Sequence, residues 1–167
     1  MSAVSLRHIT LSDADDCGRI HAQTWQTAYK DIVPDAVLAQ NTVAWRQARW
    51  RSYLTDSKPI DRLLATVAGE TVGFVCWGPG RGDPRAELMA LYVHPDHWGS
   101  GAGRALMIAA EAGLRQRAGA AFLWVLAANP RARRFYAQAG WAPDGGEKWE
   151  DFGQERLLEL RYARALR

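Results

Sequence analysis

The sequence predicts a mixed α/β fold in one domain, with a sheet whose strand order is partly antiparallel. Short apolar runs typical of strands alternate along the chain with segments of helical periodicity, and this alternation is characteristic of α/β proteins. A length of 167 residues lies near the usual size of one domain and leaves no room for a second large one. No internal repeat or linker interrupts the pattern, so we expect a single domain over residues 1–167.

The first third of the chain predicts one strand and two helices. Residues 4–9 have the pattern of a strand, and residues 12–15 combine an N-cap with acidic residues, which predicts a helix that runs to about Tyr29. Residues 31–34 should end that helix. Because proline fits the first turn of a helix, Pro34 should open a second helix that continues toward Leu54.

The middle of the chain predicts a hairpin followed by a buried strand. Residues 63–67 and 72–77 are strand-like runs joined by a short turn at residues 68–70, and a glycine-rich loop follows at residues 78–82. Residues 88–93 are nearly all apolar, as expected for a strand that is buried on both faces.

Three glycines separate this strand from a helical pattern that continues from Leu106 onward. Gly99, Gly101 and Gly103 lack side chains, so the backbone N–H groups near them can close around a phosphate. The start of a helix carries a partial positive charge and unpaired N–H groups, which favour an anion at the same place. The segment is therefore predicted to bind a phosphate group.

Two common nucleotide-binding loops do not fit this spacing. The dinucleotide fingerprint Gly-x-Gly-x-x-Gly would need a glycine where Arg104 or Leu106 stands. The loop that binds nucleoside triphosphates would need Gly-Lys-Ser/Thr, whereas Gly103 is followed by Arg104 and Ala105. Neither nucleotide class is therefore favoured.

The C-terminal part predicts a strand, a helix and a strand. Residues 122–126 form an apolar run typical of a buried strand, and residues 130–139 have the pattern of a short helix. Residues 156–162 should form a final strand.

Two motifs in this part of the chain are shared with one protein family. Residues 98–103, Trp98-Gly-Ser-Gly-Ala-Gly103, fit the pattern Gln/Arg-x-x-Gly-x-Gly/Ala except that Trp98 replaces the first Gln or Arg. Residues 129–141, NPRARRFYAQAGW, are similar to Asn-x-x-Ala-x-x-Phe-Tyr-x-x-x-Gly-Phe. Both motifs resemble those of the GCN5-related N-acetyltransferases, the GNAT family. The resemblance implies a GNAT-like, mostly antiparallel sheet flanked by helices, and the activity of an acetyl-CoA-dependent N-acetyltransferase.

The resemblance also implies where acetyl-CoA binds. The glycine loop would hold the pyrophosphate, and the pantetheine arm would pair with backbone groups of Leu91 and Val93 on the preceding strand. Arg104 and Arg133 are candidate partners of the phosphates, with an ordinary solvated surface charge as the alternative for each. The candidate coenzyme residues are Leu91, Val93, Trp98, Gly99, Ser100, Gly101, Ala102, Gly103, Arg104, Asn129 and Arg133.

Acetyl transfer to an amine needs a proton acceptor, because an alkylamine with a pKa near ~10.4 is protonated at neutral pH. Glu87 lies at the start of the strand that leads to the loop, where several members of the family carry a general-base glutamate. The resemblance therefore implies that Glu87 removes the proton, directly or through water. The alternative is an ordinary charged residue at the entrance of a strand.

The departing thiolate of the coenzyme needs a proton donor. Tyr136 stands where the family places a tyrosine near the coenzyme sulfur, and a phenol with an ordinary pKa of ~10 is protonated at neutral pH. The alternative is that Phe135 and Tyr136 are core aromatics. Neither Cys17 nor Cys76 stands beside a recognisable histidine partner, so direct transfer is favoured over a covalent acetyl-enzyme.

Trp25 and Tyr29 are the candidate acceptor residues. They share one face of the first helix, in a region that borders the acceptor cleft of the family. Their rings could hold a cationic amine, pack on an apolar group, or belong to the core. The acceptor is expected to be a primary amine of a small molecule or peptide, with small amines, polyamines, antibiotics and protein N-termini all left open.

Composition limits other functions. The net charge is only +3 and the arginines are scattered, which argues against a nucleic-acid partner. No apolar run approaches the roughly 20 residues that span a membrane, and the first residues lack the pattern of a signal peptide, so we expect a cytoplasmic protein without a membrane partner. His94, Asp96 and His97 lie close together, but no second cluster completes a metal site, and acetyl transfer needs no metal.

Two other functions stand as alternatives. A chain that kept the glycine loop but lost acceptor chemistry would be a non-catalytic acyl-CoA sensor or a partner-binding module. Binding of nucleic acid through the arginines is a weaker alternative, and it predicts strongly salt-dependent association. The sequence does not decide between a monomer and a homodimer.

Overall fold

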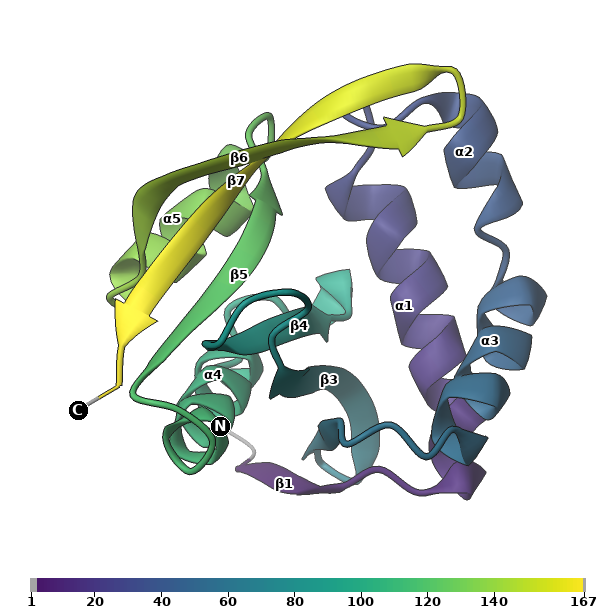
Figure 1. Cartoon of the computed structure of the whole chain (residues 1–167). Coiled ribbons are helices and arrows are strands. Elements are labelled where there is room, and N and C mark those ends of the chain that lie inside the picture. The colour runs from purple at the N-terminus through teal and green to yellow at the C-terminus, as the bar shows by residue number, and fades with distance from the viewer. Residues whose placement is uncertain (1–2, 167) are drawn as a thin grey trace.

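The computed structural model describes residues 3–166, which form seven strands and five α-helices (Figure 1). The strands are β1 (Val4–His8), β2 (Asp61–Val67), β3 (Glu70–Pro79), β4 (Ala86–Val93), β5 (Ala120–Leu126), β6 (Ala142–Phe152) and β7 (Glu155–Ala165). The helices are α1 (Ala14–Ala28), α2 (Asp35–Gln40), α3 (Val43–Thr55), α4 (Ala102–Arg115) and α5 (Pro130–Gln138), and 3-10 turns cover Leu11–Asp13 and Pro95–His97. The strand order is β1-β2-β3-β4-β5-β7-β6, and every neighbouring pair except β4 and β5 is antiparallel. The predicted mixed, mostly antiparallel sheet is confirmed.

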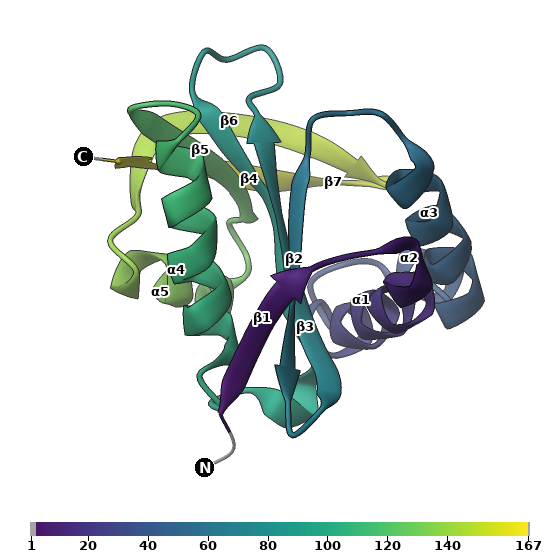
Figure 2. The same ribbon diagram turned by 90° about the horizontal axis from the view of Figure 1, so that it is seen from below.

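Helices cover both faces of this sheet (Figure 2). On one face α1 packs against α3 and over β3 and β4, while on the other face α4 lies over β2, β3 and β4. One core gathers around Leu106 and Trp141 on the α4 side, and a second gathers around Ile20, Trp50 and Phe74 on the α1 side. None of the helices in residues 3–166 is long and apolar enough to cross a membrane.

A gap opens between the two parallel strands β4 and β5. Within residues 3–166 they pair at only two positions, Ala86 with Ala121 and Glu87 with Phe122, and then separate toward their C-terminal ends (Figure 1). Backbone groups of β4 beyond Glu87 therefore lack a strand partner on the β5 side. The gap divides the sheet into one half made of β1 to β4 and another made of β5, β7 and β6.

The region after Pro34 forms two helices, so the predicted single helix is wrong. α2 ends at Gln40 and α3 begins at Val43. The break occurs because Thr42 caps α3: its Oγ1 accepts a 3.1 Å hydrogen bond from the backbone N–H of Trp45.

Two further elements differ from the sequence prediction. β6 has no counterpart among the predicted strands, because its sequence, APDGGEKWEDF, has no apolar run and most of its side chains are exposed. It adopts the strand conformation by pairing with β7 at the edge of the sheet. α4 begins at Ala102 rather than near Leu106, so the helix starts directly from the glycine loop.

Candidate active site

A cleft of about 700 Å³ has walls on both sides of the gap between β4 and β5. The glycine loop, α4 and α5 line one end, and α1, β6 and β7 line the other. Most of the predicted site residues line this cleft, namely Trp25, Tyr29, Glu87, Leu91, Val93, Trp98, Gly99, Gly101, Gly103, Arg104, Asn129 and Tyr136. Three predicted residues do not line the cleft: Ser100 of the loop, Ala102 at the start of α4, and Arg133 of α5.

The loop has a backbone conformation that favours glycine. Gly99 and Gly101 have φ angles of 84° and 89°, a region that other residues rarely adopt. Gly101 is the N-cap of α4, so the unpaired N–H groups of the first helical turn lie beside the cleft. One of them is already used, since Ser100 Oγ accepts a 3.3 Å hydrogen bond from the N–H of Ala102. The remaining N–H groups and the helix dipole favour an anion here.

Trp98, at the first position of the loop motif, is held by two contacts. Its Nε1 donates a 2.8 Å hydrogen bond to the carbonyl of Val93, and the guanidinium carbon of Arg131 lies 3.1 Å from the ring centroid. The carbonyl of Val93 also accepts a 3.4 Å hydrogen bond from Thr24 Oγ1. A pantetheine arm that contacted Val93 would therefore share this carbonyl with the indole.

Three arginines line the loop end of the cleft: Arg104, Arg131 and Arg134. Arg133 points elsewhere, because its Nε donates a 3.1 Å hydrogen bond to Tyr162 Oη and its Nη1 donates to a backbone carbonyl just after β5. Arg131 and Arg134 share a helix face because they are one turn apart on α5. The positive charge of α5 thus reaches the cleft through Arg131 and Arg134 and not through Arg133, the arginine of α5 that the sequence predicted.

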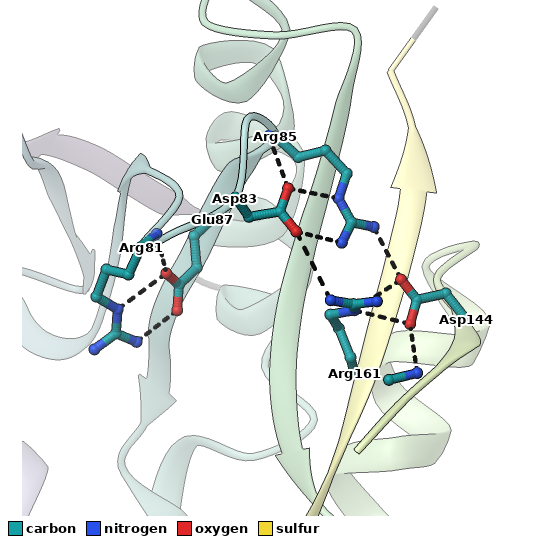
Figure 3. A network of polar contacts seen from close by, with 7 residues as sticks. Arg81, Asp83, Arg85, Glu87, Asp144 and Arg161 are labelled. Carbon is teal, nitrogen blue, oxygen red and sulfur yellow. Dashed lines mark hydrogen bonds and ion pairs between the residues drawn. The ribbon is translucent and has the colours of Figure 1, made fainter. Parts of the chain in front are cut away.

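Glu87 is buried at the closed end of the gap, with 2% of its side chain exposed. Arg81, in the loop between β3 and β4, donates to both carboxylate oxygens, from Nε at 3.0 Å and from Nη2 at 2.5 Å (Figure 3). The backbone N–H of Arg81 adds a 3.3 Å hydrogen bond. These hydrogen bonds raise the pKa of the Arg81 guanidinium. The contact is therefore a bidentate ion pair beside the cleft.

Four more charged residues fasten the same loop to the far half of the sheet (Figure 3). Arg85 donates to Asp83 at 2.6 Å within the loop and to Asp144 of β6 at 2.9 Å. Arg161 of β7 donates to Asp144 at 2.9 Å and lies 3.7 Å from Asp83. Burial of Asp144 opposes its ionisation, but Arg85 and Arg161 lower its pKa to about 2. The loop that carries Arg81 is thus anchored across the β4–β5 seam.

Tyr136 lies on α5 and lines the cleft. Burial, and to a lesser extent Tyr92, raises the pKa of its phenol, so the hydroxyl is protonated at neutral pH. Asn129 caps the same helix, because its Oδ1 accepts a 3.1 Å hydrogen bond from the N–H of Ala132. The second sequence motif therefore starts α5 and also supplies part of the cleft wall.

Trp25 and Tyr29 form an aromatic unit with Tyr92 at the other end of the cleft. Trp25 Nε1 donates a 3.2 Å hydrogen bond to Tyr92 Oη, and the hydroxyls of Tyr29 and Tyr92 lie 3.3 Å apart. The rings of Trp25 and Tyr29 meet edge to face, with their centroids 4.8 Å apart. Burial raises the pKa of Tyr29 well above its ordinary value, so this hydroxyl is neutral.

Sequence reasoning missed several residues that line the cleft. They are Arg81, Met89, Tyr92, Trp124, Arg131, Arg134, Lys148, Phe152 and Glu159. Tyr92 stands in the apolar run of β4, where an aromatic residue has the pattern of a core position. Glu159 did carry a signal, because it is a charged residue inside the otherwise apolar run LLEL of β7.

The structure also shows where the two cysteines and the turn with His94 and His97 lie. Cys17 and Cys76 are buried free thiols that do not line the cleft, and burial raises the pKa of Cys76 to about 12. His94 Nε2 lies 3.0 Å from Gln23 Oε1. His97 lines the cleft, and its Nε2 lies 3.8 Å from a carboxylate oxygen of Glu70 on β3. Among residues 3–166, no group of three or more His, Cys, Asp and Glu side chains is arranged to hold a metal ion.

Known proteins resemble this chain over most of its length. The sequence matches the model of the acetyltransferase (GNAT) family over residues 22–141. An uncharacterised N-acetyltransferase of Mycobacterium tuberculosis is 34% identical over 142 residues, which cover 81% of this chain and 86% of that protein.

Two solved structures share the fold. The GCN5-related N-acetyltransferase from Rhodopseudomonas palustris aligns with a TM-score of 0.80 at 24% identity, covering 99% of this chain and 98% of that one. The PaiA N-acetyltransferase from Thermoplasma acidophilum, solved in complex with coenzyme A, aligns with a TM-score of 0.70 at 18% identity, covering 98% of this chain and 99% of that one.

Proposed function

The chain belongs to the acetyltransferase (GNAT) family, and from this premise we propose that it transfers an acetyl group from acetyl-CoA directly to a primary amine of a small molecule or peptide. One observation carries the proposal: a single cleft joins the glycine loop at the start of α4 to the carboxylate of Glu87 and the phenol of Tyr136. We assign the activity to one domain that spans residues 1–167.

The loop end of the cleft fits a ligand that carries phosphates. Gly99 and Gly101 have open space beside the first turn of α4, and three arginines place positive charge at the same end. Along the gap, the unpaired backbone groups of β4 suit the peptide-like pantetheine arm. The same fold was solved with coenzyme A in the Thermoplasma acidophilum protein, which supports this placement.

Glu87 is the proposed proton acceptor. Bound acetyl-CoA would supply an acyl group activated as a thioester. The acceptor nitrogen can attack it only after the ammonium form has lost a proton, because an ammonium has no free lone pair. Glu87 faces the cleft and can take that proton directly or through one water. Its pairing with Arg81 fixes the orientation of both oxygens, and an incoming proton has to displace part of that pairing.

Tyr136 is the proposed proton donor. Its burial-raised pKa keeps the hydroxyl protonated, so it can give a proton to the departing thiolate and later regain one from solvent. Direct transfer is favoured over a covalent acetyl-enzyme, because both cysteines are buried away from the cleft and burial keeps Cys76 protonated.

Release of free coenzyme A thiol tests the proposal. With acetyl-CoA and a panel of primary amines, we expect thiol release that depends on the amine and on the enzyme. Omission of the amine is the matched control, and binding of acetyl-CoA is followed in parallel as a rise in melting temperature. A protein that binds acetyl-CoA but releases thiol with no amine would instead be a non-catalytic acyl-CoA sensor.

A further inference from the structure

Arg46 is a buried arginine next to the end of the cleft that Trp25 and Tyr29 line, where the acceptor is expected to bind. We call this the acceptor end. It lies on α3 with 7% of its surface exposed, and its guanidinium carbon lies 4.6 Å from the centroid of the Trp25 ring. Within residues 3–166 it forms no ion pair, and its buried Nε has no hydrogen-bond partner. Trp25 lines the cleft and Arg46 does not, so the positive charge stands behind the ring that the acceptor would meet.

This charge makes Trp25 a poor site for a second cation. An aromatic face attracts a cation through the negative potential of its π system, and Arg46 already uses that attraction. Burial lowers the pKa of Arg46, but an arginine stays charged at neutral pH. Because a buried charge is weakly screened by water and salt, a second positive charge across the ring would be repelled.

The other groups that could hold an ammonium at this end are already paired. Glu159 lies 3.1 Å from Lys148 Nζ, and Glu87 is paired with Arg81. The ammonium of Lys148 also lies 4.8 Å from the centroid of Trp124. The surface that stays open for an acceptor is largely apolar and comes from Tyr29, Met89, Leu126 and Phe152.

We propose, building on the acetyl transfer proposed above, that the acceptor is a monoamine with an apolar or aromatic body, and that Arg46 excludes polyamines by its charge behind Trp25. The reacting nitrogen gives up its proton at Glu87 and needs no lasting counter-ion. A second ammonium would stay charged near Arg46, whose charge has no ion-pair partner in the described residues, whereas an apolar body gains free energy as it leaves water.

Pentylamine and 1,5-diaminopentane test this proposal, because they differ by one ammonium on a chain of the same length. For the wild type we expect kcat/KM to be about 10-fold or more higher with pentylamine, after correction for the two equivalent nitrogens of the diamine. Arg46→Met should reduce this preference to about 3-fold or less, because it removes the repelling charge and keeps an apolar stem of similar length.

Arg49→Met is the matched control. Arg49 lies on the same helix, but it is exposed, and its guanidinium lies over Trp45 and Tyr53 rather than over Trp25, so this variant should keep the wild-type preference. Melting temperatures check that each variant folds, and Arg46→Gln replaces Arg46→Met if the latter does not.

Two results would overturn the proposal: equal or better use of the diamine by the wild type, or an unchanged preference in a folded Arg46 variant. The same two amines are compared as ligands of the coenzyme A complex by the shift in melting temperature, which requires no turnover. Tighter binding of pentylamine supports the monoamine class, and tighter binding of the diamine contradicts it. A complete lack of acetylation would count against the proposed function, while this binding comparison would still decide the acceptor class.

Discussion

Arg81 and Glu87 form a bidentate ion pair in which the guanidinium is largely exposed and the carboxylate is buried, with side-chain exposures of 70% and 2%. Both side chains line the cleft, so an acceptor that reaches the carboxylate there meets the exposed guanidinium beside it. Among the described residues, Arg81 alone orients the carboxylate of Glu87. Its guanidinium donates to both carboxylate oxygens, and its backbone N–H donates to one of them.

Glu87→Gln should lower turnover by about 10²- to 10⁴-fold and leave acetyl-CoA affinity near the wild-type value, since it removes a proton acceptor and keeps the shape. Turnover should recover as the pH approaches the pKa of the amine, because free base then forms without the enzyme. A pH profile of kcat, with Glu155→Gln at the exposed start of β7 as the control, measures this. Wild-type turnover of Glu87→Gln at neutral pH would assign the base to another group or to water.

Tyr136→Phe should lower turnover toward the lower end of the range of about 10²- to 10⁴-fold, because solvent can also protonate a fairly stable thiolate. The ring is kept, so the melting temperature should change little. Since the pKa of Tyr136 lies above its ordinary value of 10.0, wild-type activity should show no loss from its ionisation below that pH. Tyr53→Phe, on α3 and outside the cleft, is the control. Undiminished turnover of a folded Tyr136→Phe, where chemistry limits the rate, would leave Tyr136 as coenzyme packing.

Gly101→Val should abolish the rise in melting temperature that acetyl-CoA produces, because it strains a φ of 89° and places a branched side chain at the N-terminus of α4. Gly145→Val is a matched control, since Gly145 has a φ of 88°, has open space around it and lies outside the cleft. Both variants should be destabilised, but Gly145→Val should retain the acetyl-CoA shift. Equal shifts in the two proteins would argue against the loop as the phosphate site.

Asp144→Asn should destabilise the protein at neutral pH and lose that effect in acid. The folded-state pKa of Asp144 is lowered from 3.8 to about 2, so its ionisation contributes stability above pH ~4 that is lost as the pH falls toward ~2. The contribution at neutral pH is at most about 2 kcal/mol, reduced by partial exposure of the side chain. Urea unfolding of wild type and variant at several pH values measures it. A difference that stays constant down to pH ~2 would contradict the assignment of the stability to this ionisation.

The strands and helices with strong patterns could be predicted from the sequence. The apolar run of β4 and the glycines after it placed the strand, the loop and the following helix, because burial and positive φ angles both limit the residue types. β6 could not be predicted, because its conformation depends on pairing with β7 rather than on its own side chains. The break before α3 did have a local signal, the capping threonine Thr42, within a pattern that otherwise suits one helix.

Site residues that belong to a sequence motif could be predicted. Contacts between residues that lie far apart in the sequence could not. The pattern of α5 indicated Asn129 and Tyr136, both of which line the cleft. The same pattern could not show that Arg133 turns to Tyr162, because this partner lies on β7, far along the chain from α5. The contact of Arg46 with Trp25 joins two helices, and no local sequence pattern encodes it.

The two residue pairs between β4 and β5 form the vertex of a wedge between the two half-sheets. In the described chain, Ala86 and Glu87 carry the backbone pairing between the two half-sheets, and the ion pair of Arg85 with Asp144 crosses between them at the same end. The strands lie nearest each other at Glu87 and diverge toward the glycine loop that follows β4 (Figure 1). The carboxylate of Glu87 therefore sits at the vertex of the wedge, where the paired backbones of both half-sheets fix the spacing of the cleft walls.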